Sequence, residues 1–328
     1  MRESKPQISY LSPLAPHLCQ FVEEKRALGC RYDSSALMLV RFDRFLLDRQ
    51  TTTPDLPKAV IEAWARRRSH ESVSTTQLRI SLVRQFCLFL IRRGFAPYLP
   101  GTHLVPKGRS SFVPYIFTQG QVSRFLGAAD QMPPSPYSPR RNVIFPLMFR
   151  LLYGCGLRAG EARHLRIKDL DPARGILTIR EAKFRKDRLV PVAPTLAARL
   201  RSYAAIHLNG KGPDDLVFPA PYGGPFAHQT VHETFRELLW ACRISHGGRG
   251  CGPRLHDLRH TFAVHRLMQW YRNGADLDVA LPVLATYLGH VSLSGTQKYL
   301  RLTAEMYPDL IAALQARFGE VIPRKEQS

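Results

Sequence analysis

Six side chains beyond residue 150 have the chemical types that cleavage of a phosphodiester bond requires. They are cations, imidazoles and one phenol, and their spacing is not that of metal ligands: Arg158, Lys183, His256, Arg259, His290 and Tyr299. Cationic donors can stabilise a phosphorus centre that gains negative charge, a hydroxyl can attack it, and an ammonium can protonate the leaving oxygen. A tyrosine hydroxyl, with a pKa of about 10, is a poor nucleophile unless cations surround it.

Two of these cations fall in predicted bends. Arg158 lies in the stretch Gly156–Glu161, and Glu161 is three residues further on, where its carboxylate can hold the guanidinium. A salt bridge at a helix end would give the same string of residues. Lys183 lies at the tip of a predicted hairpin, where it could approach a bound phosphate and donate a proton. An ordinary solvated charge is the alternative for Lys183.

A histidine–arginine pair opens a predicted helix at His256–Phe262. His256 and Arg259 are three residues apart and share a face, so both could contact one anion near the helix N-terminus. His256 and His260 are four residues apart, which is also the spacing of one class of zinc site. The zinc interpretation fits badly, because Asp257 replaces the glutamate of that motif and no third ligand is evident.

The candidate nucleophile Tyr299 follows the triplet Leu288–His290 by nine residues. A packed core or surface aromatic is the commoner role of a single tyrosine. Tyr307 is the only competing hydroxyl at a suitable distance, and Pro308 directly after it indicates a helix boundary. We therefore prefer Tyr299.

Four helices are predicted to form a small bundle in the first hundred residues. Apolar side chains recur at helical spacing, and helix-capping residues precede several of the segments. The predicted helices cover residues 14–28, a segment from Ser34 or Ser35 to Leu47, a segment from Pro57 to Arg68, and a segment from Ser74 to Gly94.

The rest of the chain is predicted to form a second, larger domain. A stretch rich in Pro, Gly and Ser marks a linker at 106–117, between a helical domain at 1–105 and a catalytic domain at 118–328. This second domain also has a helical pattern, apart from two β-branched runs at 176–180 and 188–192 that predict a hairpin. The expected fold class is mainly α with a small β-hairpin or sheet (α+β).

Charge points to the kind of partner. The chain has 47 Lys and Arg against 26 Asp and Glu, a net charge of +21 and a pI near 10.2. Such a balance favours a polyanion, because basic residues that neutralise phosphates release counterions. A generally basic protein is the alternative. With 45% hydrophobic residues the chain is globular. The six scattered cysteines predict reduced, mostly buried thiols, and no membrane span or secretory signal is evident.

The order of these motifs resembles the tyrosine recombinase (phage integrase) family over nearly the whole second domain. The motifs that carry the likeness are Arg158, Lys183, His256-x-x-Arg259, Leu288-Gly289-His290 and Tyr299. The helical bundle before them resembles the core-binding domain of that family, which clamps DNA. The resemblance therefore covers about residues 10–320.

The resemblance implies a role for each residue. Tyr299 would attack a DNA phosphate and form a 3′-phosphotyrosine, and Arg158, Arg259 and His290 would bind the non-bridging oxygens. Lys183 would protonate the departing 5′ oxygen, and His256 would assist proton transfer near Tyr299. Glu161 would support Arg158. No metal and no other cofactor is implied.

Two departures from the family pattern bear on these expectations. Phe184 follows Lys183 where many relatives have glycine, which leaves Lys186 open as an alternative to Lys183. The segment from Trp270 to Leu284 is longer than in compact members and looks like that of recombinases carried by transposable elements.

The resemblance also implies partners and a location. We expect double-stranded DNA and a homo-tetramer on it, alone or with related recombinases, in which a helix at 307–318 docks on a neighbour. We expect no membrane contact and a cytoplasmic, nucleoid-associated protein. The function would be strand cleavage and rejoining for integration, excision or transposition. The alternatives are a DNA-binding accessory subunit, or nicking and relaxation as in a topoisomerase.

Overall fold

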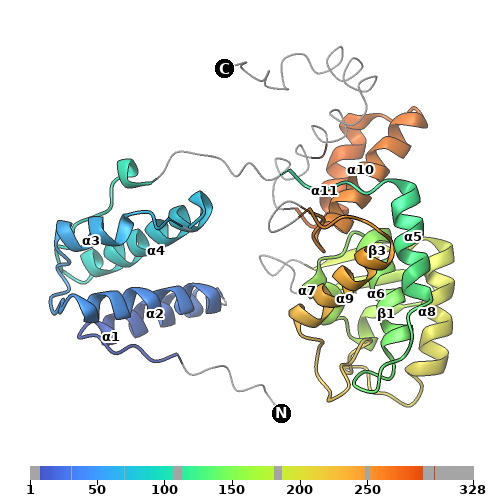
Figure 1. Cartoon of the computed structure of the whole chain (residues 1–328), viewed down its shortest axis with the longest axis horizontal. Coiled ribbons are helices and arrows are strands. Elements are labelled where there is room, and N and C mark those ends of the chain that lie inside the picture. The colour runs from blue at the N-terminus through green and yellow to red at the C-terminus, as the bar shows by residue number, and fades with distance from the viewer. Residues whose placement is uncertain are drawn as a thin grey trace. The chain divides into compact units, whose positions relative to one another are not determined.

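The structure, a computed structural model, describes residues 8–30, 32–69, 71–105, 113–180, 187–247, 252–290 and 299. The chain divides into two compact units, Met1–Phe112 and Val113–Ser328 (Figure 1). Helices dominate both units, and the second also contains one small antiparallel sheet. The predicted fold class, mainly α with a small sheet, is confirmed.

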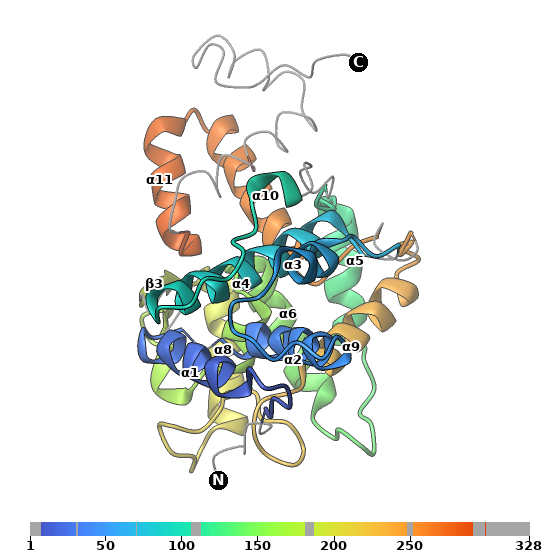
Figure 2. The same ribbon diagram turned by 90° about the vertical axis from the view of Figure 1, so that its left-hand side faces the viewer.

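The described part of the first unit has four α-helices around an aromatic core (Figure 2). The core is formed by fully buried rings that pack edge-on and tilted against one another, among them Phe21, Phe42 and Phe86. The helices are α1 (Ala15–Ala27), α2 (Asp33–Asp48), α3 (Lys58–Ala65) and α4 (Val73–Arg92), followed by a short 3₁₀ turn, η1 (Thr102–Leu104).

Two of the predicted helix starts in this unit are wrong by one or two residues. Helix α4 is capped by Ser72, whose Oγ accepts a hydrogen bond from the Thr75 backbone, rather than by Ser74. Helix α2 begins at Asp33, before Ser34 and Ser35, after Tyr32 in the left-handed conformation. Pro57 directly precedes α3, but the helix ends at Ala65 and not at the predicted Arg68.

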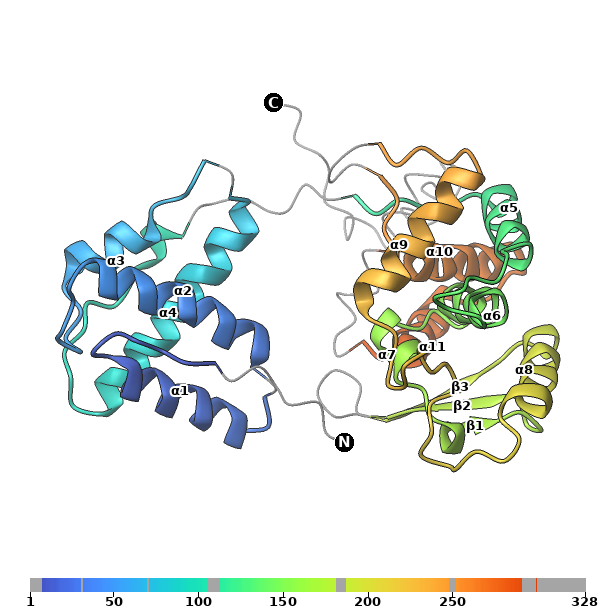
Figure 3. The same ribbon diagram turned by 60° about the horizontal axis from the view of Figure 1, so that its bottom comes forward.

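The second unit combines seven α-helices with three strands in its described part. The helices are α5 (Gln119–Asp130), α6 (Arg141–Gly154), α7 (Ala159–Arg163), α8 (Pro194–His207), α9 (His228–Ala241), α10 (Asp257–Arg272) and α11 (Leu277–Leu288), with a 3₁₀ turn, η2 (Ile167–Asp169). The strands are β1 (Leu170–Asp171), β2 (Ile176–Ile179) and β3 (Arg188–Pro191), which run side by side in that order (Figure 3).

The predicted hairpin is present, and a third strand joins it. Strands β2 and β3 pair antiparallel, with Ile176 opposite Pro191 and Ile179 opposite Arg188. The two-residue strand β1, which the sequence did not indicate, adds to the free edge of β2. The register places Arg188 at the start of β3, next to the segment that contains Lys183.

Helix α6 forms the centre of this unit and supports the elements that carry the candidate site. Phe145, Phe149 and Leu152 are among its buried side chains, and α10 packs against it. Helices α10 and α11 lie together at one end of the unit, and α11 also contacts β3 (Figure 1). The ends of α6, α10, α11 and β3 therefore lie near one another.

None of the helices in the described ranges has both the length and the apolar surface that crossing a bilayer requires. The cysteines in these ranges are free thiols, three buried and two exposed: Cys87, Cys155, Cys242, Cys19 and Cys30.

Candidate active site

Five of the six predicted site residues lie in the described part of the chain. Arg158 precedes α7, His256 and Arg259 lie at the start of α10, and His290 follows α11 directly. Tyr299 is also described, and it packs into the same core cluster as α10 and α11. Lys183, its alternative Lys186, and the predicted helix at 307–318 lie outside the described residues.

Arg259 is a buried cation that two main-chain carbonyls hold in place. The residue is 1% exposed, and its guanidinium donates to Gly156 O and to Leu288 O, both at 2.5 Å. Burial and the nearby charge of Arg158 lower its pKa to about 10. Within the described ranges no carboxylate forms an ion pair with Arg259, so its charge is available for an anionic ligand.

Gly156 is needed at this position for two reasons. Its φ of +58° lies in the left-handed region, and a Cβ atom there would come within 2.7 Å of the Phe262 ring and 2.8 Å of the Leu288 side chain. Its carbonyl is also an acceptor for Arg259. The glycine thus lets the loop before Arg158 approach α10 and α11 closely.

Glu161 binds two guanidinium groups. Its carboxylate accepts from the backbone N and Nη1 of Arg158, both at 2.8 Å, and from both terminal nitrogens of Arg188 at 2.9 and 2.8 Å. Burial opposes ionisation, but the bonds to Arg188 and then to Arg158 outweigh it and lower the pKa of Glu161 to about 2. One carboxylate therefore serves two cations, and a positive charge remains.

The contact between Glu161 and Arg158 that the sequence predicted is present, whereas the role of Arg188 was missed. Arg188 is 7% exposed and also donates to Tyr287 O at 2.9 Å, which ties β3 to α11. The Arg158 side chain is 27% exposed, and its Nη2 donates to Gly289 O at 3.2 Å. Of the two partners of Glu161, only Arg158 has a face open to a ligand.

The two predicted site histidines are held neutral at pH 7. Burial, followed by the charges of Arg259 and Arg158, lowers the pKa of both His256 and His290 to about 4. His256 is exposed to solvent on one side, so the charges of Arg259 and Arg158 contribute more to its shift than burial does. A neutral imidazole still carries one N–H that can donate to a phosphate oxygen.

Tyr299 is buried among these groups. It is 3% exposed, its ring stacks on that of His290 with centroids 5.8 Å apart, and its hydroxyl lies 3.1 Å from Nδ1 of His260. Burial raises its pKa, while Arg259 and then Arg158 lower it. The cations that a tyrosine nucleophile needs are thus present around Tyr299.

His260 is a further candidate that the sequence reasoning considered only as a zinc ligand. Its ring also packs edge-on against that of His256, with centroids 4.7 Å apart. The signal that could have found it is its place next to Arg259 in the first turns of α10. No group of three or more His, Cys, Asp or Glu side chains in the described ranges is arranged to hold a metal ion.

The second unit is helical with a small sheet and buries a tyrosine among arginines and histidines. Known proteins that are similar to this chain place it among the enzymes that break and rejoin DNA. The sequence pattern of the phage integrase family matches residues 116–306. The protein y4rB of Sinorhizobium fredii, named as an integrase or recombinase, is 32% identical over 92% of this chain and 96% of its own. The chain therefore belongs to the phage integrase family, the tyrosine recombinases.

Other relatives and solved structures agree with this assignment. The tyrosine recombinase XerD of Oceanobacillus iheyensis is 28% identical over 75% of this chain and 77% of its own. The integrase of transposon Tn1549, solved with transposon right end DNA, has a TM-score of 0.63 at 17% identity, covering 90% of this chain and 99% of that one. XerH bound to difH has a TM-score of 0.62 at 17% identity, covering 85% and 78%. The two structures show the fold.

Proposed function

We propose that this recombinase cuts and rejoins DNA at specific sites through a 3′-phosphotyrosine on Tyr299, without a metal. The observation that carries the proposal is the position of the Tyr299 hydroxyl beside His260 and in the field of Arg259 and Arg158. A buried phenol among cations is suited to nucleophilic attack on a phosphate, whose negative charge the same cations can bind.

The roles of the remaining residues follow from their chemistry. Arg259, the open face of Arg158, and the neutral His290 would bind the non-bridging oxygens of the phosphate. His256 would assist proton transfer near Tyr299, and Lys183 would protonate the departing 5′ oxygen. Glu161 would orient Arg158 through its two hydrogen bonds.

Rejoining would reverse the same step. The 5′-hydroxyl of a partner strand attacks the phosphotyrosine, so one phosphodiester replaces another and no ATP is consumed. Because the phosphate charge is bound in both directions, the same donors serve both halves of the reaction.

We also propose that the N-terminal domain, 1–105, clamps DNA, and that the linker 106–117 joins it to the catalytic domain, 118–328. Three exposed arginines, Arg66, Arg67 and Arg68, follow α3 and form a basic loop. No ion pair neutralises them within the described residues. Such a loop is suited to contact with DNA phosphates.

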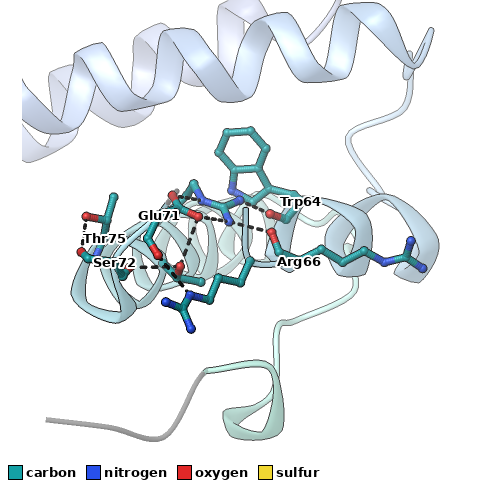
Figure 4. A network of polar contacts seen from close by, with 8 residues as sticks. Trp64, Arg66, Glu71, Ser72 and Thr75 are labelled. Carbon is teal, nitrogen blue, oxygen red and sulfur yellow. Dashed lines mark hydrogen bonds and ion pairs between the residues drawn. The ribbon is translucent and has the colours of Figure 1, made fainter. Parts of the chain in front are cut away.

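A buried ion pair holds this basic loop (Figure 4). Arg79 of α4 is 3% exposed and binds both carboxylate oxygens of Glu71 at 3.0 and 2.9 Å. The same guanidinium donates to the carbonyls of Trp64 and Arg66, at the end of α3. The pair thereby fixes the main chain where the arginines begin.

Assembly and biological role are further parts of the proposal. A homo-tetramer on double-stranded DNA, alone or with related recombinases, would bring two duplexes together, with the segment 307–318 docking on a neighbour. The long segment from Trp270 to Leu284, which forms the end of α10, a short turn and most of α11, favours a recombinase of a transposable element, acting in integration, excision or transposition. Its place would be the cytoplasm, associated with the nucleoid.

The first test is covalent trapping of DNA without added metal. A nicked duplex from the ends of the element should give a slow-migrating protein–DNA band on a denaturing gel with the wild type and none with Tyr299→Phe. Tyr307→Phe is the matched control and should form the band. If the wild type retards DNA on a native gel but forms no covalent band, the protein is an accessory subunit and the catalytic assignment is wrong.

A further inference from the structure

We propose that His260 is the base that takes the proton from Tyr299. The inference rests on the proposed function of Tyr299 as nucleophile and adds a catalytic residue to that reaction. The observation is the contact between His260 Nδ1 and the Tyr299 hydroxyl at 3.1 Å, within the range from which a general base can accept a proton.

Helix α10 fixes His260 with respect to the phosphate-binding groups. His260 directly follows Arg259, and its backbone N donates to His256 O within the helix. The side chain is half-buried, so the contact with Tyr299 is partly shielded from water. Because one rigid helix carries both residues side by side, Arg259 can bind the charge of the phosphate while His260 deprotonates the attacking hydroxyl of Tyr299.

The two other histidines of the site are less suited to this step. The contact between His290 and Tyr299 is a stacking of rings, with an angle of 22° between their planes. His256 packs edge-on against His260 and lies in the field of both Arg259 and Arg158, which disfavours a second positive charge there. The contact of 3.1 Å between Nδ1 and the hydroxyl thus favours His260 as the base.

The step balances as a proton transfer coupled to displacement at phosphorus. With Nε2 protonated, Nδ1 of His260 accepts the hydroxyl proton while the Tyr299 oxygen forms its bond to phosphorus. The bond from phosphorus to the 5′ oxygen breaks, and that oxygen takes a proton from Lys183. Rejoining returns each proton to its source, so no other reactant is needed.

Helix α10 also contains a matched control. Nδ1 of His265 lies 3.0 Å from the hydroxyl of Tyr153, the same kind of contact at nearly the same distance. Neither residue belongs to the proposed machinery. His265→Asn therefore measures what the loss of such an imidazole does to the helix itself.

The experiment compares His260→Asn with His265→Asn in single-turnover cleavage of the nicked duplex. Asparagine can still accept a hydrogen bond near the place of Nδ1, but it cannot take up the proton. We expect His260→Asn to cleave about 10²–10³-fold more slowly than the wild type, with unchanged DNA binding. His265→Asn should remain within about threefold of the wild type, as expected for a residue outside the reaction. Should His260→Asn melt early, His260→Gln serves in its place.

A second readout separates a base from a structural residue. Fluorinated tyrosine, whose phenol ionises more readily, is introduced at position 299 alone. If His260 is the base, this change should raise the cleavage rate of His260→Asn at least tenfold. It should give no such gain in the wild type. A defect of packing would not be repaired in this way.

Two outcomes would overturn the inference, and both differ from failure of the proposed function. In the first, His260→Asn cleaves DNA at the wild-type rate. In the second, His260→Asn cleaves slowly and fluorinated tyrosine at position 299 does not raise its rate. In both cases the wild type forms the covalent complex and Tyr299→Phe does not. If the wild type forms no covalent complex, the proposed function itself fails.

Discussion

Each of the two units contains a buried cluster of carboxylate and guanidinium groups, and the two clusters differ in their charge. In the first unit, Arg79 is the one ion-pair partner of Glu71 among the described residues, and the side chains of Glu71 and Arg79 are 8% and 4% exposed. In the second unit, Glu161 is shared by Arg158 and Arg188. Arg259 lies beside this cluster with main-chain carbonyls as its acceptors.

The difference indicates what each cluster does. A one-to-one pair is neutral and complete, and it joins α3 to α4. A cluster with more guanidinium groups than carboxylates buries positive charge that no anion of the protein balances. Such burial costs free energy unless a ligand supplies the negative charge. A phosphate of DNA would supply it. The first cluster is therefore structural, and we propose that the second binds the phosphate.

The largest expected effect comes from removing the buried cation, with Arg259→Gln. Loss of a donor that binds the charge developing on the phosphate should slow single-turnover cleavage by about 10²–10³-fold. The measurement is the rate of covalent complex formation at saturating DNA. Arg201→Gln, which removes an exposed arginine bonded to the Pro172 carbonyl, is the control. More than a tenth of the wild-type rate in Arg259→Gln would mean that the phosphate is bound elsewhere.

The second effect should separate the two clusters directly, through Glu71→Gln and Glu161→Gln. Breaking a buried pair leaves an uncompensated charge, so Glu71→Gln should lower the free energy of unfolding by about 3 kcal/mol. This value is at the lower end of the range for a buried pair, because Glu71 as a whole residue is only half-buried. Its cleavage rate at saturating DNA should stay within about threefold of the wild type.

Glu161→Gln should differ from Glu71→Gln in its effect on cleavage. It loses the charge that orients Arg158, and misplacement of that guanidinium should slow cleavage by about 10- to 100-fold. Its free energy of unfolding should fall as well, because the charges of Arg158 and Arg188 lose their shared carboxylate, so the cleavage rate is the measurement that separates the two variants. Chemical denaturation and single-turnover cleavage of both variants check the comparison. Equal effects of the two substitutions on cleavage would abolish the distinction.

The sequence predicts only the part of the second cluster that is local in the chain. Glu161 lies three residues after Arg158, so their contact follows from helical spacing. Arg188 is 27 residues from Glu161 and His260 is 39 from Tyr299, and only the packing of β3, α10 and α11 brings them together. Spacing rules do not reach such pairs.

The same limit explains the smaller errors in the helices. Ser72 and Ser74 can both cap a helix, and the choice depends on where Glu71 is held. That position is fixed by Arg79, eight residues further on. The existence of the four helices and the hairpin, by contrast, depends on apolar periodicity, which is read directly from the sequence.

The smallest expected effect concerns the pH dependence of stability. His256 and His290 have a pKa of about 4 in the folded protein, against about 6.5 when unfolded. Between these values the unfolded chain binds more protons, so stability is full above pH 6.5 and falls as the pH is lowered towards 4. His256 is partly open to solvent, which screens its share, so most of the loss should come from His290.

The comparison that checks this is the melting temperature of the wild type and of the double variant His256→Asn, His290→Asn, at pH 7.5 and 5. The wild type should lose a few degrees more than the variant over this interval.

Asp257, with a pKa raised to about 6 mainly by burial, has the opposite dependence of stability on pH. It is present in both proteins and so cancels in the difference. Glu71→Gln and the wild type should lose the same number of degrees between these two pH values, because a carboxylate whose pKa is lowered by Arg79 stays ionised at both. If the double variant and the wild type lose the same amount, the guanidinium groups do not act on the two histidines, and the excess charge of the second cluster is already neutralised without DNA.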